Sequence, residues 1–241
     1  MLCMKISPRD ASILRQVSRF GQLSAGHIRT LEFSTNGSKT PCDRVLKRMH
    51  ETKLLRRIER RIVGGFNGGS GVYVYQLGSK GWTFMRRETK YWPFRAIDEH
   101  TLAIADCYVQ AVEAERAGLL RINSFTTEPD TWLDVAGAQL RPDLLLEVGV
   151  MAKRANMRIW VEVDQGTERR KQITDKIARY RHAYRNWSSE RGSETFPLVV
   201  FVAVDELRER ELTTLLRGLP DEARKLFTVT TGESFPQLWT S

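Results

Sequence analysis

Three acidic side chains in the second half of the chain have the types and spacing of a metal site. Asp143 opens one apolar run, and Glu162 and Asp164 lie two residues apart in the next. Successive side chains of a strand point to opposite faces, so we expect Glu162 and Asp164 to share one face of a sheet. Grouped carboxylates bind Mg²⁺ or Mn²⁺, and such an ion can activate water against a phosphodiester.

The elements around these carboxylates alternate between strands and helices. A helix from about 101 to 118 and a strand at 119–127 come first. The periodicity then predicts strands at 143–148, 157–163, 197–204 and near 226–230, with helices at 168–187 and 206–217. This order predicts an α/β domain that brings the carboxylates together on neighbouring strands.

The first part of the chain differs sharply in charge. Residues 1–97 hold 19 Lys and Arg against 6 Asp and Glu, whereas residues 98–241 hold 19 against 23. A basic module that contacts a polyanion, followed by a module with another task, explains such an asymmetry. The basic residues fall on several short elements, which disfavours a single amphipathic helix on a membrane surface.

The basic part predicts three helices followed by two strands. Helical periodicity covers 10–19 and 24–32, and Thr40-Pro41 begins a third helix. After the third helix, two short runs of apolar and polar residues lie on either side of a glycine-rich tip at 64–71. This pattern predicts an antiparallel hairpin. This order resembles a winged helix-turn-helix over about residues 10–84, a fold that places its third helix in the major groove of DNA.

The winged-helix resemblance implies a set of DNA-contacting side chains. On and just before the third helix these are Lys39, Arg44, Lys47 and Arg48, which we expect to be largely free for phosphate. On the hairpin they are Arg56, Arg57, Arg60 and Arg61, whose alternative interpretation is a solvated hairpin edge.

The second half resembles the core of the PD-(D/E)xK nuclease superfamily. Pro142, Asp143 and Glu162 match the motif, but Asp164 occupies the position of the lysine that assists the attacking water in that superfamily. Some members carry this lysine on the following helix, and helical geometry places Lys176 at the margin of the apolar stripe there. The resemblance therefore implies catalytic roles for Asp143, Glu162, Asp164 and Lys176; alternatively, Lys176 is a boundary lysine whose stem covers apolar surface.

Taken together, five features are similar to the replication-relaxation family of bacterial plasmids and other mobile elements. They are the winged helix, a helix beginning near residues 100–102, the segment 141–143, the segment 161–168, and Tyr180 four residues after Lys176. That resemblance covers roughly residues 10–205. It implies a role in plasmid replication, DNA relaxation or mobilisation, beside a relaxase or a replication protein. A homodimer is left open.

These patterns predict an α+β and α/β protein with a winged helix at 8–95 and a PD-(D/E)xK nuclease-like domain at 98–241. The leading hypothesis is duplex DNA binding with a degenerate nuclease-like domain; the alternatives are a Mg²⁺-dependent nickase or endonuclease and a winged-helix transcription regulator. Three scattered cysteines and no long apolar run predict a cytoplasmic protein with no membrane contact.

The acidic cluster carries one electrostatic expectation. Three neighbouring carboxylates without a compensating cation repel one another. Asp143, Glu162 and Asp164 should therefore either bind Mg²⁺ or Mn²⁺ or share a proton at a raised pKa.

Overall fold

The computed structural model describes residues 6–33, 38–61 and 72–240, and for residues 59–61 and 72 it describes the backbone alone. The chain divides into two compact units, residues 1–109 and 110–241, referred to as unit 1 and unit 2. Helices combine with sheets that contain both antiparallel and parallel pairs, which confirms the α+β class. The glycine-rich tip at 64–71 lies outside the described residues.

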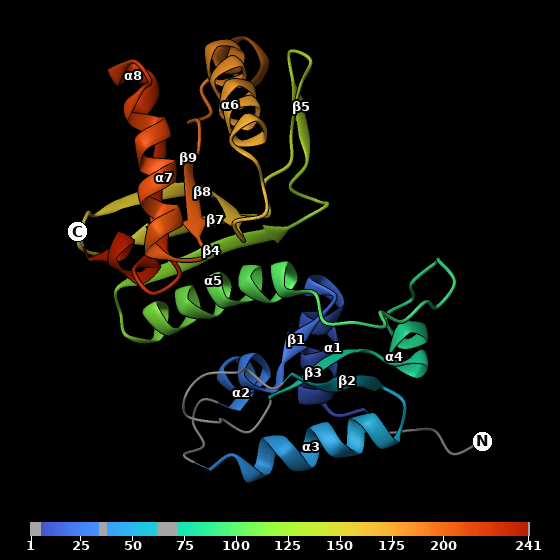
Figure 1. Cartoon of the computed structure of the whole chain (residues 1–241). Helices are drawn as coiled ribbons and strands as arrows, with labels where there is room; N and C mark the ends of the chain where they lie inside the picture. The colour runs from blue at the N-terminus through green and yellow to red at the C-terminus, as the bar shows by residue number, and fades with distance from the viewer. Residues whose placement is uncertain (1–5, 34–37, 62–71, 241) are drawn as a thin grey trace. The chain divides into compact units, whose positions relative to one another are not determined.

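Unit 1 consists of short helices packed on a small antiparallel sheet (Figure 1). Its elements are α1 (Pro8–Phe20), β1 (Leu23–Ser24), α2 (Ala25–Phe33), α3 (Thr40–Glu51), β2 (Leu55–Arg61), β3 (Val72–Leu77), α4 (Ser79–Phe84) and the first part of α5 (Glu99–Arg116). The strand order is β1-β3-β2. All three predicted helices and both strands of the hairpin are present.

The helices of unit 1 form because their apolar residues recur on one face and their ends are capped. Ile13, Leu14 and Val17 of α1 are fully buried, as the spacing i, i+1, i+4 requires for one side of a helix. Ser7 caps α1 by accepting a hydrogen bond from the amide of Asp10, and the Asp10 side chain accepts from the amide of Ser7 in return.

The buried carboxylate of Asp10 also accepts a hydrogen bond from Arg48 of α3 at 2.6 Å. Burial opposes ionisation of this carboxyl, but the bonds from Arg48 and Ser7 outweigh it and lower the pKa of Asp10. One charge pair thus joins the first and third helices of unit 1.

Two buried glutamines fix the segment that leads from α4 to α5. The side-chain amide of Gln76 donates to the carbonyl of Phe94 and its oxygen accepts from the amide of Phe94, both at 2.8 Å. Gln22 makes the same two-way contact with the carbonyl of Ala96 and the amide of Asp98, both at 3.0 Å. The segment is therefore hydrogen-bonded to the interior of unit 1, as a strand would be.

Unit 2 is built on a five-stranded mixed sheet with the order β10-β9-β8-β7-β4. Its elements after α5 are β4 (Leu120–Thr127), β5 (Leu133–Val135), β6 (Ala138–Leu140), β7 (Leu144–Val150), β8 (Ala155–Asp164), α6 (Arg170–Arg191), β9 (Leu198–Ala203), α7 (Glu206–Arg217), α8 (Asp221–Arg224), β10 (Phe227–Thr231) and the 3₁₀ turn η1 (Phe235–Trp239). Strands β8, β9 and β10 run parallel, whereas β4, β7 and β8 are antiparallel neighbours. The β5–β6 hairpin was not predicted.

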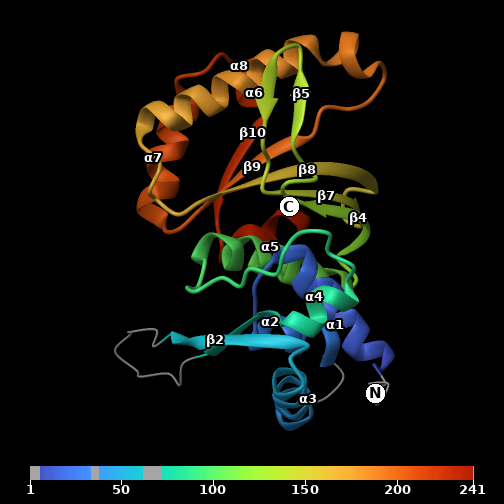
Figure 2. The same ribbon diagram turned by 90° about the vertical axis from the view of Figure 1, so that its right-hand side faces the viewer.

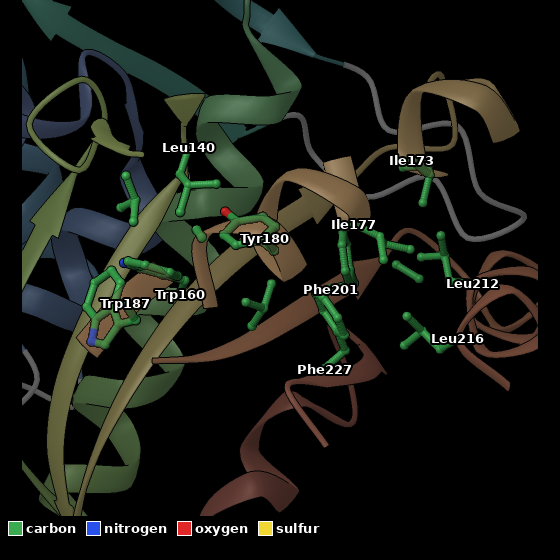
Figure 3. Packing of buried hydrophobic residues seen from close by; sticks show 14 residues of the cluster. Leu140, Trp160, Ile173, Ile177, Tyr180, Trp187, Phe201, Leu212, Leu216 and Phe227 are labelled. Carbon is green, nitrogen blue, oxygen red and sulfur yellow. The ribbon is translucent and has the colours of Figure 1, made fainter. Parts of the chain in front are cut away.

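Helices α6 and α7 cover one face of this sheet (Figures 1 and 2). Between them and the strands lies an apolar core in which Trp160 packs against Tyr180 and Trp187, while Phe201 packs against Phe227 (Figure 3). Aromatic burial of this extent supplies much of the favourable free energy of folding. It also fixes the rotation of α6, which decides which side chains of that helix approach the acidic strand β8.

The Asp10–Arg48 pair generates a prediction for unit 1. Asp10→Asn should lower the free energy of unfolding at pH 7 by about 1–3 kcal/mol, because a charge-assisted hydrogen bond in a buried position is lost. A group with a lowered folded pKa contributes stability that is fully present above its unfolded pKa, here 3.8, and that is lost as the pH falls from there through the lower folded pKa. Urea unfolding at pH 7 and near pH 3 tests this: the parent and Asp10→Asn should converge in acid, and an unchanged difference would contradict the assignment.

Candidate functional site

The basic surface expected on unit 1 is present in part. Lys39, Arg44 and Lys47 are exposed on or just before α3. The ammonium group of Lys47 lies 3.9 Å from the carboxylate of Glu51. Because both side chains are mostly exposed to water, this ion pair is weak. The α3 side chains are available to a ligand.

The hairpin contributes further arginines next to α3. Arg56 and Arg57 are exposed on β2, and the guanidinium of Arg57 lies 4.1 Å from the ring centroid of Tyr73. Arg60 and Arg61 belong to β2 by their backbone, and their side chains lie outside the described residues.

The expectation for Arg48 is wrong. It was predicted to be free for phosphate, but its guanidinium is committed to the buried Asp10 and its side chain is only 47% exposed. Helical periodicity places Asp10 among the buried residues of α1, which indicates that its carboxylate needs a partner but does not identify that partner as Arg48. Arg48 therefore stabilises unit 1 whatever else it contacts.

The acidic residues of unit 2 come together as the sequence predicts. Asp143 immediately precedes β7, and the antiparallel register pairs Leu144 with Val161, which sets Asp143 beside Glu162. Glu162 and Asp164 lie on the sheet face that contacts α6 and α7. All three carboxylates are buried, with 6% of Asp143, 2% of Glu162 and 4% of Asp164 exposed.

Asp143 is held by the neighbouring strand. Its Oδ2 accepts a hydrogen bond of 2.6 Å from the amide of Val163, and its own amide donates to the carbonyl of Val161. The carboxylate thus satisfies a backbone donor at the point where the β7–β8 ladder ends.

Glu162 is held by two side chains of α6. Its Oε2 accepts from Lys176 Nζ at 2.8 Å, and its Oε1 accepts from the hydroxyl of Tyr180, one helical turn further along. Burial raises the pKa of Glu162 to about 7, with Asp143 adding to the rise and Lys176 opposing it. Burial disfavours the charged form of Lys176 too, but Glu162 and Glu168 overcome this and raise its pKa.

Asp164 is held by α7. Arg208 donates from Nε at 3.2 Å to Oδ1 and from a terminal nitrogen at 3.0 Å to Oδ2, the two-pronged geometry that suits a carboxylate. Oδ1 also accepts from the amide of Gly166 at 2.6 Å. Arg208 completes its bonds with the carbonyl of Glu168 and the carboxylate of Glu211.

The acidic cluster is consequently not the unpaired set of charges that the sequence predicted. Lys176 compensates Glu162, and Arg208 compensates Asp164. The ammonium group of Lys176 bridges Glu162 and Glu168, a contact that the interpretation as a boundary lysine does not include. A metal ion at Glu162 or Asp164 would have to displace these donors, so these two carboxylates as arranged do not fit Mg²⁺ or Mn²⁺.

The sequence predicts no site role for Arg208, and it marks Tyr180 only as part of the family resemblance. Tyr180 follows Lys176 by four residues, so the helical spacing that placed Lys176 near the cluster was enough to find it. Arg208 lies 44 positions from Asp164 and contacts it only because α7 packs on the sheet. Nothing in the local sequence indicates that pair.

Comparisons with known proteins agree with the sequence resemblance. The family model described as replication-relaxation matches residues 14–199. No curated protein and no solved structure matches the chain significantly. Among the described residues, none of the helices is both long and apolar enough to cross a membrane.

The raised pKa of Glu162 generates a prediction for unit 2. Its folded pKa of about 7 exceeds the reference value of 4.5, so its contribution to stability is complete below pH 4.5 and is lost as the pH rises through 7. The free energy of unfolding should therefore fall by roughly 3 kcal/mol across this window. Glu162→Gln cannot titrate and should flatten the profile, while Glu190→Gln, exposed at the end of α6, should leave it unchanged. An equally steep profile for Glu162→Gln would refute the assignment.

Proposed function

The chain belongs to the replication-relaxation family, and from this premise we propose that it binds duplex DNA through unit 1 during replication, relaxation or mobilisation of a mobile element. Family membership itself indicates a role in replication or relaxation. A relaxase or a replication protein is the partner class that such a role implies. The DNA contact rests on the residues of unit 1.

The element order of unit 1 supports a winged helix. Helix, short strand, two helices and a two-stranded hairpin follow one another, and the three strands form one antiparallel sheet. In winged helices the last of these three helices enters the major groove and the hairpin contacts the backbone. These roles fall here to α3 and to β2 with β3.

One observation carries the proposal: α3 presents Arg44 and Lys47 to solvent, next to a strand that presents Arg56 and Arg57. Among the described residues, Arg44 forms no ion pair. Exposed cations on a helix and an adjacent hairpin, in a segment with 19 basic and 6 acidic residues, match the charge of duplex DNA.

For unit 2 we propose a nuclease-like scaffold that has become structural. The resemblance of its element order to the PD-(D/E)xK core supports the nuclease-like part of this proposal, and the burial of Glu162 and Asp164, bonded to Lys176, Tyr180 and Arg208, supports the structural part. Buried, hydrogen-bonded ion pairs of this kind tie helices to a sheet and need no catalytic role. The alternative function, a winged-helix transcription regulator, would use the same DNA contact of unit 1. In such a regulator unit 2 would only form a dimer or bind a ligand.

A Mg²⁺-dependent nickase is the second candidate, and one observation favours it. Lys176 Nζ lies 2.8 Å from Glu162, as expected if the catalytic lysine has moved to the following helix. The burial of Glu162 and the bonded state of both its oxygens favour the scaffold instead.

The DNA contact leads to a prediction about α3 and the hairpin. Arg44→Gln with Lys47→Gln should reduce the preference for a selected site over random duplex, because α3 would read base edges. Arg56→Gln with Arg57→Gln should weaken binding to both DNAs alike and lower the salt dependence, because phosphate contacts are lost. Fluorescence anisotropy on the two duplexes at two salt concentrations measures this. Identical losses from both pairs on both duplexes would exclude this docking.

The scaffold proposal leads to a prediction about unit 2. With supercoiled plasmid, Mg²⁺ or Mn²⁺ should produce no more nicking than EDTA does, and neither ion should raise the Tm of the full chain, because the carboxylate oxygens are already bonded. Glu162→Gln and Lys176→Met serve as comparison variants. Nicking that requires Mg²⁺ and disappears in both variants would establish the nickase and overturn the scaffold.

A further inference from the structure

A basic groove lies between α6 and the turn of the β5–β6 hairpin. The two elements stand side by side in both views (Figures 1 and 2), and the Nε2 of His182 lies 3.1 Å from the carbonyl oxygen of Ala136. The space between them has a volume of about 570 Å³. This groove is separate from the acidic cluster, since its lining includes none of the cluster's carboxylates.

Small residues keep the groove open. The hairpin turn consists of Ala136 and Gly137, both with left-handed backbone angles, φ 49° and φ 81°. Asp134 fixes this turn by accepting a 2.9 Å hydrogen bond from the amide of Gly137. Ala138 and Ala178 line the groove with single methyl groups. An L-residue such as Ala136 is uncommon in the left-handed region, so its position is imposed by the surrounding contacts.

The groove is lined by cations that the fold leaves uncommitted. Arg179, Arg181 and Arg185 line it on the α6 side, and none of them forms an ion pair with any carboxylate of the described residues. The Nε of Arg181 is buried and finds no acceptor in the part of the chain that the structure describes. Arg181 and Arg185 lie one turn apart on α6, about 6 Å along its axis. A buried donor without a partner indicates a missing acceptor.

The charge of α6 contrasts with the rest of unit 2. Residues 169–191 hold eight Lys and Arg against two Asp and Glu, whereas the remainder of residues 110–241 holds eleven against eighteen. The positive charge is thus gathered on one helix of an otherwise acidic unit. Such local concentration attracts a polyanion even where the net charge does not.

We infer that the groove binds phosphate groups of a DNA backbone, as a second DNA contact located in unit 2. Arginine suits this ligand because its planar fork donates two parallel hydrogen bonds to phosphate oxygens. The inference rests on the proposed DNA-binding function and extends it to a surface outside the winged helix. Duplex DNA and a free phosphate compound both offer phosphate oxygens to these arginines, and the extended backbone of DNA is the ligand we assign.

The salt dependence of binding by the full chain tests the groove. Arg179→Gln with Arg185→Gln should make the slope of log K against log salt less steep by about 2, because each lost phosphate contact removes about 0.9. Both side chains are exposed, so folding should be retained, as checked by Tm. Lys153→Gln with Lys225→Gln, exposed cations of unit 2 outside the groove lining, is the matched control and should leave the slope unchanged. An unchanged slope for the groove variant overturns the inference, and an equal change in the control shows that only overall charge matters and overturns it too.

Arginine modification by phenylglyoxal, read by mass spectrometry on the parent protein, identifies the ligand. Duplex DNA should protect Arg179, Arg181 and Arg185, and inorganic phosphate at the same phosphate concentration should not. Equal protection by inorganic phosphate would assign the groove to a free phosphate compound, and protection by neither would exclude a phosphate site. If Arg44→Gln with Lys47→Gln weakens binding while the groove arginines stay unprotected, the inference fails and the proposed function stands. If the parent binds no duplex at all, both fail.

Discussion

The structure of unit 2 depends on the cost of burying carboxylates in β8. Glu162 and Asp164 lie on the inner face of a sheet, where an ionised group without a partner is strongly destabilising. Each is compensated by a cation from a different helix, Lys176 of α6 and Arg208 of α7. These ion pairs fix the positions of α6 and α7 along β8. The apolar packing of Trp160, Phe201 and their neighbours is not directional and would fix these positions less precisely. Loss of either cation would remove its bonds to the strand and weaken the attachment of a whole helix.

Much of this fold could be predicted from the sequence because periodicity is a local property. Helix α7 has the bounds that the sequence indicated, Glu206–Arg217, and the strands around the acidic residues lie where alternation placed them. The β5–β6 hairpin was missed since its strands have three residues each and its turn has an alanine where asparagine or glycine is usual. Short strands give too few positions for a pattern.

The candidate site could be predicted only as far as side chains on one element are concerned. Strand alternation brought Glu162 and Asp164 to one face, and helical spacing brought Lys176 near them. The partner of Asp164 and the partner of Arg48 both come from distant elements, and tertiary packing decides such pairs. The net charge of the second half likewise does not reveal the positive charge of α6, because the acidic residues of the other elements outnumber the basic residues of that helix. Where charges gather on the surface is thus determined by the fold, and composition alone does not reveal it.

The hydrogen bonds of the buried glutamine Gln22 limit where the chain can be cut if unit 1 is still to fold by itself. Gln22 is buried, and both partners of its side chain, Ala96 and Asp98, follow the aromatic segment at 91–94. A fragment that stopped at residue 95 would retain the helices and the hairpin but leave that buried amide with neither acceptor nor donor. The smallest part of unit 1 that could be exchanged between proteins therefore extends at least to Asp98. A fusion joined before that residue would leave the buried side chain of Gln22 unpaired, although Gln22 lies far from the junction in the sequence.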